Sequence, residues 1–276
     1  MSEDAETRLA GIEVLNRRHL DALNRRTKGP FSASEAEKIL SLDHKRILRL
    51  LAYLATRGWL KRVRRGLYIT VPLGSLNPSQ RTEDPWVLAS TVFAPCYIGG
   101  WSACEHWGLT EQIFNDIVVV STKRRRTKRQ SIQSFNYVVR LVPQHCFFGA
   151  QTIWRERSQV MVSDPSKTIV DGLDNPSIVG GVRHLAEIVT AYFSSEHRND
   201  EKLVDYLQKQ ENGAAYKRFG YLIETLAINS AKLIDECLSR MGSGYSSLDP
   251  SLKSTGNYLK RWYLKVNVSI EPKANV

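Results

Sequence analysis

The sequence predicts an α+β fold, with an N-terminal winged helix-turn-helix domain followed by a larger mixed α/β C-terminal domain. Three observations support this prediction. Two helical patterns joined by a tight turn lead into two strand patterns, positive charge is concentrated in two places, and the later region mixes short apolar strands with longer helices. We expect the winged helix-turn-helix domain in residues 1–70, a linker in 71–85 and the second domain in 86–276.

Apolar residues at helical spacing predict a first helix over residues 12–26. A shorter helix follows, which Ser32 or Ser34 can cap and which ends at Leu40. Ser41–Leu42 then forms the turn. In helix-turn-helix proteins, a pair of elements of this kind holds the next helix toward a DNA groove.

The next helix is expected to begin at Asp43 and to end at Gly58, with Ile47 and Leu50 on its core side. Four basic side chains lie away from that apolar stripe: His44, Lys45, Arg46 and Arg49. The first turns of such a helix reach base edges, and arginine is the commonest partner of guanine. Arg46 and Arg49 are therefore the first candidates for base readout.

Two strands, Leu60–Val63 and Gly66–Ile69, are expected to pair as a basic hairpin, the wing. Its cations are Lys61, Arg62, Arg64 and Arg65. The tip is suited to phosphate or to a narrow minor groove. The alternative, a solvated hairpin on a winged helix that binds protein, remains open.

The formal charge is +11, from 39 basic and 28 acidic residues. Residues 16–75 hold 14 basic residues against four acidic ones. A second run without any acid consists of Lys123, Arg124, Arg125, Arg126, Lys128 and Arg129. Clustered cations release counterions from DNA phosphates, so the composition favours double-stranded DNA as partner. The second run is either another DNA contact or a solvated loop between two strands.

Other features limit the class of protein. No apolar run approaches the roughly 20 residues needed to cross a bilayer, and the acidic N-terminus lacks the apolar stretch of a secretory signal. The four cysteines are widely spaced without a Cys-x-x-Cys motif. Cys104-Glu105-His106 is the best start of a metal site, but no four-ligand spacing follows. We expect a cytoplasmic protein with buried thiols and with neither metal nor cofactor.

The second domain is expected to contain both strands and helices. The sequence does not predict the order of the strands in the sheet. Helices are predicted at 86–93, 102–108, 164–173, 182–193, 200–209 and 215–240, and strands at 95–98, 116–121, 137–141, 161–162 and 262–270.

Ordered motifs in both parts resemble one family. The winged helix ends in Arg-Arg-Gly-Leu-Tyr at 64–68. The second part carries the motifs Tyr97–Ala103, Gly108–Gln112, Asp164–Thr168 with Asp171, Gly180-Gly181 and Lys217–Leu222. Together, over about residues 15–230, they are similar to AbiEi-type antitoxins, the regulatory half of AbiE abortive-infection, or type IV, toxin–antitoxin systems.

The resemblance implies a transcriptional repressor that binds inverted repeats in its own promoter and counteracts a nucleotidyltransferase-like toxin encoded next to it. The N-terminal domain would recognise the promoter, and the C-terminal domain would supply the antidote activity. DNA contacts carry over to positions 44–46, 49 and 61–65. No family catalytic residue carries over, so no enzyme activity is expected. Direct contact with the toxin stays open.

Two alternatives come from other residues. Asp164 and Lys167 could belong to a metal-dependent nuclease, but the second acid–x–Lys element is missing, and an N-cap at Asp164 followed by Pro165 explains the same motif. The role of Asp171 stays open. A ligand-sensing regulator unrelated to a toxin is the other alternative.

Overall fold

The computed structural model describes residues 12–71, 83–155, 157–253 and 255–270. Helices and strands are mixed as predicted, which confirms the α+β class. The chain divides into two compact units. The first runs to Ala94 and takes in Ser131–Phe135 and Trp154–Val160, and the second holds the rest of the chain. Most of the expected linker, residues 72–82, lies outside the described residues.

The N-terminal region contains the three predicted helices and the predicted hairpin. The elements are α1 (Val14–Arg26), β1 (Phe31–Ser32), α2 (Ala33–Leu40), α3 (His44–Thr56), β2 (Leu60–Arg64) and β3 (Leu67–Thr70). The strands pair antiparallel in the order β1-β3-β2. The two-residue β1 was not predicted, because it is too short to show a strand pattern.

Side-chain caps set the beginnings of the two helices after α1. Ser32 is the N-cap of α2: its hydroxyl accepts from the Glu35 amide at 3.2 Å, and the Glu35 carboxylate accepts from the Ser32 amide at 2.7 Å. Asp43 caps α3 by accepting from the Arg46 amide at 3.0 Å. Between them, Ser41 ends α2 in the left-handed conformation with φ of 53°. Ser41 and Asp43 therefore fix where α2 ends and where α3 begins, and so define the turn between them.

A small apolar core lies beneath α3. Ile47, Leu51 and Leu54 are fully buried, and Leu50 is 9% exposed, so the predicted stripe is confirmed. They pack with residues of α1 and α2 in one cluster, against which Trp59 is partly buried. Because one face of α3 holds the core, the opposite face is left for solvent or for a partner.

The larger region is built on a six-stranded mixed sheet. Its strands are β4 (Cys96–Ile98), β5 (Asp116–Ser121), β6 (Arg129–Ile132), β7 (Phe135–Leu141), β8 (Ala150–Arg155) and β9 (Ser158–Ser163), in the order β6-β7-β5-β4-β9-β8. Strand β5 runs antiparallel to β4 and parallel to β7. The edge strands β6 and β8 were not predicted, because their residues are largely polar or exposed and show no apolar alternation.

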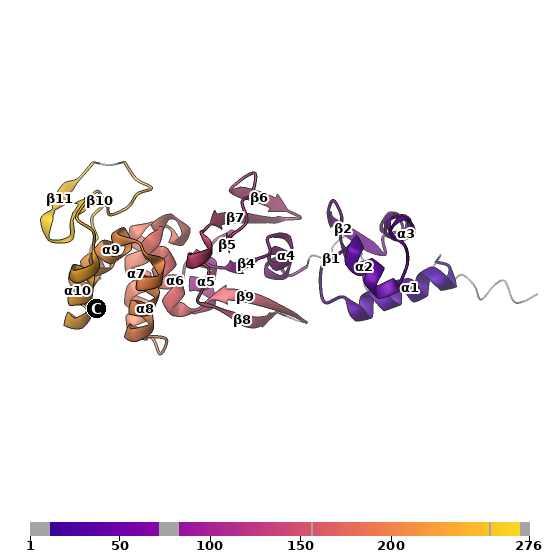
Figure 1. Cartoon of the computed structure of the whole chain (residues 1–276), viewed down its shortest axis with the longest axis horizontal. Coiled ribbons are helices and arrows are strands. Elements are labelled where there is room, and N and C mark those ends of the chain that lie inside the picture. The colour runs from indigo at the N-terminus through magenta and orange to yellow at the C-terminus, as the bar shows by residue number, and fades with distance from the viewer. Residues whose placement is uncertain (1–11, 72–82, 156, 254, 271–276) are drawn as a thin grey trace, which may run out of the picture. The chain divides into compact units, whose positions relative to one another are not determined.

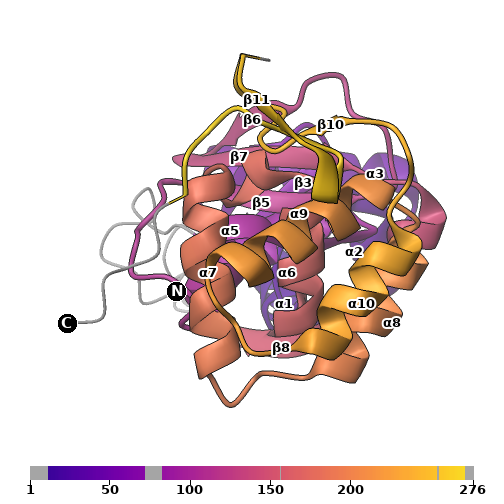
Figure 2. The same ribbon diagram turned by 90° about the vertical axis from the view of Figure 1, so that its left-hand side faces the viewer.

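Helices α6 to α10 gather around one another in the second unit (Figures 1 and 2). The helices beyond the first three are α4 (Pro85–Val92), α5 (Gly100–His106), α6 (Pro165–Asp174), α7 (Val182–Ser194), α8 (Asp200–Gln210), α9 (Gly213–Thr225) and α10 (Ala231–Arg240). Helix α6 contacts α5, α7, α8 and α9, and every residue from Ser166 to Leu173 is buried. It is the central helix of this unit.

The prediction was wrong at two places in the C-terminal region. The single helix expected at 215–240 is α9 and α10, because Ala227 takes the left-handed conformation with φ of 51° between them. The strand expected at 262–270 is reduced to β12 (Leu264–Val266). Trp262 instead belongs to a 3₁₀ turn, and Tyr263 with φ of 45° separates that turn from β12. β12 pairs with β10 (Ser246–Ser247) and β11 (Asn257–Leu259).

Two glycines of the family-like motifs are required by close packing. A Cβ on Gly220 would lie 2.1 Å from the Trp262 ring, and one on Gly100 would lie 2.3 Å from the Ile178 carbonyl. Gly100 also has a φ of 54°. Beside Gly220, Arg218 is buried and donates to the carbonyls of Leu173 at 2.7 Å and Leu248 at 3.0 Å. These motif residues therefore hold elements of the second unit together.

Candidate nucleic-acid interface

The predicted basic residues of α3 share its exposed side. His44, Lys45, Arg46 and Arg49 are all exposed, whereas Ile47 between them is fully buried. Lys45 and Arg49 are one helical turn apart, so their side chains leave the helix on the same face. Three of the four cations stand in the first turn, where a recognition helix contacts base edges.

The four side chains differ in their partners. His44 pairs through Nδ1 with Glu37 of α2, and the guanidinium of Arg46 lies 3.2 Å from the Asp43 carboxylate. Lys45 and Arg49 have no ion-pair partner within the described ranges. A surface ion pair contributes only about 0–1 kcal/mol, so Arg46 can exchange Asp43 for a base at small cost. Lys45 and Arg49 have no such ion pair to give up before they contact a partner.

The wing gathers a second set of cations. Strands β2 and β3 are joined by the two-residue turn Arg65-Gly66, in which Gly66 has a φ of 77°. Arg62, Arg64 and Arg65 are exposed, while Lys61 is half-buried. Since α3 packs against β2, the helix and the hairpin belong to one rigid body. The predicted wing positions therefore run along β2, from Lys61 near its beginning to Arg65 in the turn.

The basic run lies in the second unit, between β5 and β6. Lys123, Arg124, Arg126 and Lys128 are exposed, and Arg125 is half-buried. Arg129 opens β6 and lies 3.6 Å from the Asp116 carboxylate. The run forms a loop between two strands, as the interpretation of a solvated loop expects. Its exposed cations reach solvent, as a second DNA contact would require.

The residues of the nuclease alternative form an enclosed network. Lys167 is 0% and Asp171 1% exposed, and their charged atoms are 2.9 Å apart. Lys167 also donates to Gln210 at 2.9 Å, and the Tyr97 hydroxyl donates to Asp171 at 2.8 Å. Burial raises the pKa of the Asp171 carboxyl, against the opposing effect of Lys167. Neither charge is open to a substrate.

Asp164 is the N-cap of α6, as its structural interpretation predicted. One carboxylate oxygen accepts from the Lys167 amide at 2.9 Å. The other accepts from the Tyr206 hydroxyl at 2.8 Å and lies 2.9 Å from the Lys202 ammonium. Both oxygens are bonded within the protein, which leaves this carboxylate a structural role.

The four cysteines are buried and unpaired by disulfide bonds. Burial raises the pKa of Cys96 and of Cys237 to about 12, so these sulfurs stay thiols rather than nucleophilic thiolates. Cys104 is buried, whereas its neighbours Glu105 and His106 are exposed. Over the described residues, no group of three or more possible metal ligands comes together.

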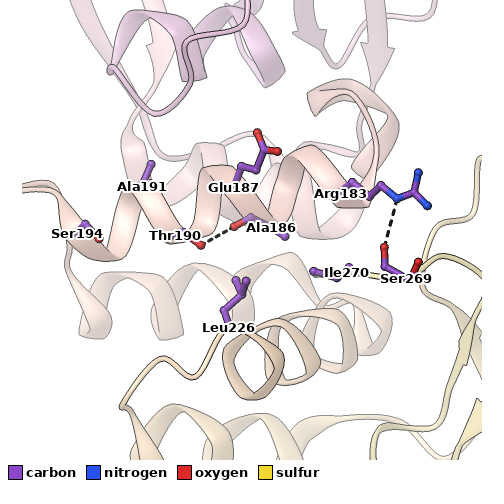
Figure 3. Close-up of a pocket in the computed structure, with 9 residues that line it drawn as sticks. All are labelled: Arg183, Ala186, Glu187, Thr190, Ala191, Ser194, Leu226, Ser269 and Ile270. Carbon is purple, nitrogen blue, oxygen red and sulfur yellow. Dashed lines mark hydrogen bonds between the residues drawn. The ribbon is translucent and has the colours of Figure 1, made fainter. Parts of the chain in front are cut away.

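A pocket of about 460 Å³ lies along α7, between Leu226 and Ser269–Ile270 (Figure 3). Its ionisable lining residues are Arg183 and Glu187, and Arg183 donates to the Ser269 carbonyl at 3.2 Å. A single acid without a paired base gives no recognisable catalytic arrangement. In the described part of the chain, none of the helices is both long enough and apolar enough to traverse a bilayer.

Comparison with known proteins finds a family whose model matches the segment that contains α3 and the wing. Residues 18–71 match the family model of a transcriptional regulator, the AbiEi antitoxin. The resemblance to AbiEi-type antitoxins is confirmed over this segment. All the positions carried over from that resemblance, 44–46, 49 and 61–65, lie inside the matched segment, and the basic run lies outside it. The general role of the AbiEi family is regulatory.

The fold of the whole chain is similar to a solved structure, the RV2827C protein from Mycobacterium tuberculosis. The TM-score is 0.63 at 15% sequence identity, and the match covers 92% of this chain and 91% of that one. At this identity the likeness is one of fold. Comparison with curated proteins gives no significant match.

Proposed function

We propose that this AbiEi-type chain is a promoter-binding repressor and the antitoxin of a type IV, AbiE-like system in the cytoplasm. It would bind inverted repeats in its own promoter and counteract a nucleotidyltransferase-like toxin encoded beside it. One observation carries the DNA-binding part: α3 exposes Lys45, Arg46 and Arg49 on the side opposite its buried core stripe.

In this proposal α3 lies in the major groove with its first turns toward the bases. Arg49 and Arg46 each present a planar fork that matches the two acceptors of guanine. Lys45 and the wing residues Arg62 and Arg65 neutralise phosphates, which sets the register of the helix without reading sequence. Inverted repeats require two copies of the chain, one on each half-site.

The basic run adds a backbone contact from the second unit. Its exposed cations, among them Arg124, Arg126 and Lys128, supply charge but no helix that could enter a groove. They would therefore raise affinity for any duplex rather than select one sequence.

Fluorescence anisotropy with the duplex upstream of the chain's own gene tests base readout. We expect the triple variant Arg46→Glu/Arg49→Glu/Arg65→Glu to lose at least about 100-fold in affinity, since each good arginine–guanine pair contributes about 1–3 kcal/mol. Lys232→Glu/Lys253→Glu/Lys260→Glu is the charge-matched control, because these three lysines are exposed and lie outside the proposed interface. Equal losses in the two variants, or tight binding by the first, would reject the proposal.

Removing all six charges of the basic run tests the additional contact. The affinity should fall for specific and unrelated duplexes alike, and the slope of log K against log salt should flatten by about 0.9 per lost phosphate contact. An unchanged slope would reject this contact and leave the α3 assignment standing.

The antitoxin role is tested by co-expression with the neighbouring gene, provided that gene encodes a nucleotidyltransferase. The parent chain should restore growth and repress the promoter. If the second domain supplies the antidote, the α3 triple variant should still restore growth while losing repression. Failure of the parent to restore growth would reject the antitoxin role.

A further inference from the structure

The basic run forms one wall of a cleft. A hollow of about 460 Å³ opens between this loop, strand β7 and the 3₁₀ turn Pro176–Val179. The loop is held across β7 because the Val139 amide donates to the Lys128 carbonyl at 2.7 Å. The cleft lies in the second unit and shares no residue with α3 or the wing.

The charge of the cleft is almost entirely positive. Its cationic lining residues are Lys123, Arg124, Arg125, Arg126, Lys128 and Arg140. Arg140 is paired with the carboxylate of Asp174, and among the described residues no carboxylate lines the cleft. Cations held this close together repel one another unless an anion lies between them. Arginine forks bind phosphate through two parallel hydrogen bonds, so a phosphorylated ligand fits this wall.

The other wall combines apolar surface with polar side chains, a combination that suits a base and a sugar. Leu141, which is 52% exposed, and the half-buried Val138 provide apolar surface, whereas Ile178 is only 3% exposed. Ser177 donates to the Asn175 side-chain oxygen at 2.8 Å, which leaves the Asn175 amide group available as a donor to a base edge. Small-ligand sites typically measure about 300–1,000 Å³ and combine an apolar lining with a few polar groups.

We infer that this cleft binds a nucleoside triphosphate, with the phosphates on the basic run and the base against Leu141 and Val138. Inorganic phosphate would leave the apolar wall uncovered, and a nucleoside without phosphates would leave the basic run without an anionic ligand. The inference concerns a small ligand and does not require that the winged helix binds DNA.

A consequence follows where the proposed function also holds. The same exposed cations, Arg124, Arg126 and Lys128, would serve the nucleotide and the DNA backbone. The two ligands therefore compete, and the nucleotide weakens the non-specific part of DNA binding. Base contacts through α3 are untouched, because they use other residues.

Isothermal titration calorimetry on the full chain without DNA tests the site, with ATP, GTP, AMP and inorganic tripolyphosphate as probes. We expect at least one triphosphate to bind, with AMP and tripolyphosphate each at least about tenfold weaker. Absence of binding by both ATP and GTP would overturn the inference. Tripolyphosphate binding as tightly as ATP would also overturn it, since the cleft would then be a polyanion site only.

Two variants place the ligand in the cleft. Arg124→Gln/Arg126→Gln/Lys128→Gln should weaken triphosphate binding at least tenfold, whereas the charge-matched control Lys232→Gln/Lys253→Gln/Lys260→Gln should not change it. Leu141→Asn should weaken binding of ATP but not of tripolyphosphate, because it alters only the apolar wall. An equal effect of the two triple variants would place the nucleotide elsewhere. A chain that fails to bind promoter DNA but still binds ATP would separate the failure of the proposed function from this inference.

Discussion

Helices α3 and α6 use the same residue types for opposite purposes. In α3 the cations Lys45, Arg46 and Arg49 are exposed, and only Arg46 of these three has an acidic partner in the described part of the chain. In α6 the ammonium of Lys167 is fully buried and bonded to both Asp171 and Gln210. The difference teaches that burial, not the presence of charge, separates a residue that is available to a partner from one that maintains the fold.

The physical reason is the cost of dehydration. A charge taken out of water costs several kcal/mol, which only close partners offset, so a buried lysine must be fully bonded. An exposed lysine or arginine keeps its water and can exchange that water for a phosphate or a base. The comparison would fail if the protein kept its stability after the loss of Lys167 in α6, or lost stability after the loss of Arg49 in α3.

The largest expected effect is on stability at α6. Lys167→Met leaves the Asp171 carboxylate buried without its ionic partner, and the free energy of unfolding should fall by about 3–5 kcal/mol. Urea unfolding followed by circular dichroism measures it. The control is Lys209→Met, which removes an exposed ion pair with Asp205 at the same spacing and should cost below about 0.5 kcal/mol.

The double variant Lys167→Met/Asp171→Asn sharpens this test, because no charge is then left in the network. The amide oxygen of the introduced asparagine can still accept from the Tyr97 hydroxyl, so that hydrogen bond is kept. The double variant should recover at least half of the lost stability. A double variant as unstable as the single one would show that packing around Lys167, and not the unpaired charge, determines the effect.

The next effect is on DNA affinity at α3. Arg49→Ala should weaken promoter binding by about 1–3 kcal/mol, the range for one bidentate base contact. The free energy of unfolding should change by no more than about 0.5 kcal/mol, because the side chain is exposed and has no ion-pair partner among the described residues. A large loss of stability with unchanged affinity would reverse the comparison between the two helices.

A smaller effect is expected at the wing. Arg65→Gln removes one cation from the hairpin turn, so binding should weaken by a similar factor for promoter and unrelated duplexes. The salt slope of binding should decrease by about 0.9. Selective loss of promoter binding would instead assign Arg65 to sequence readout, and the same measurement on Lys253→Gln serves as control.

The smallest effect concerns pH and Asp249. Burial tends to raise the pKa of this carboxyl, but hydrogen bonds from Ser251 and from the Val182 amide, with the charge of Arg218, bring it below its usual 3.8. Its contribution to stability is therefore present above about pH 3.8 and is lost as the pH falls through the lowered pKa. In urea unfolding at pH 3–6, Asp249→Asn should show a shallower acid-side loss than the parent. Parallel curves would contradict this linkage.

The sequence was sufficient for the three N-terminal helices and the hairpin because their signals are local. Ser32 or Ser34 before the second helix and Asp43 before an apolar stripe marked the two helix starts, and the hairpin followed from two short strand patterns around Arg64-Arg65. The cations of α3 that led us to expect DNA binding, Lys45, Arg46 and Arg49, are exposed in the structure. Which bases or phosphates they contact is a property of a complex, and the pattern of one chain does not contain it.

The second unit was less predictable because its determinants are distant in sequence. The strand order brings β4 between β5 and β9, and no local pattern encodes that neighbourhood. Asp171 is bonded to Tyr97, 74 residues away, so its role could not be found before the fold was known. The cleft beside the basic run is of the same kind, since Arg140 and Ile178 join it only through the tertiary structure.

The carboxylate of Asp43 has a consequence for how an operator could vary. One of its oxygens receives the Arg46 amide and the other faces the Arg46 guanidinium, so α3 keeps its first turn when that guanidinium leaves for a base. If α3 reads bases as we propose, a mismatched base opposite Arg46 would let its side chain return to Asp43, whereas a mismatch opposite Arg49 would leave that guanidinium without an acidic partner among the described residues. Half-sites would then vary more at the base read by Arg46 than at the base read by Arg49.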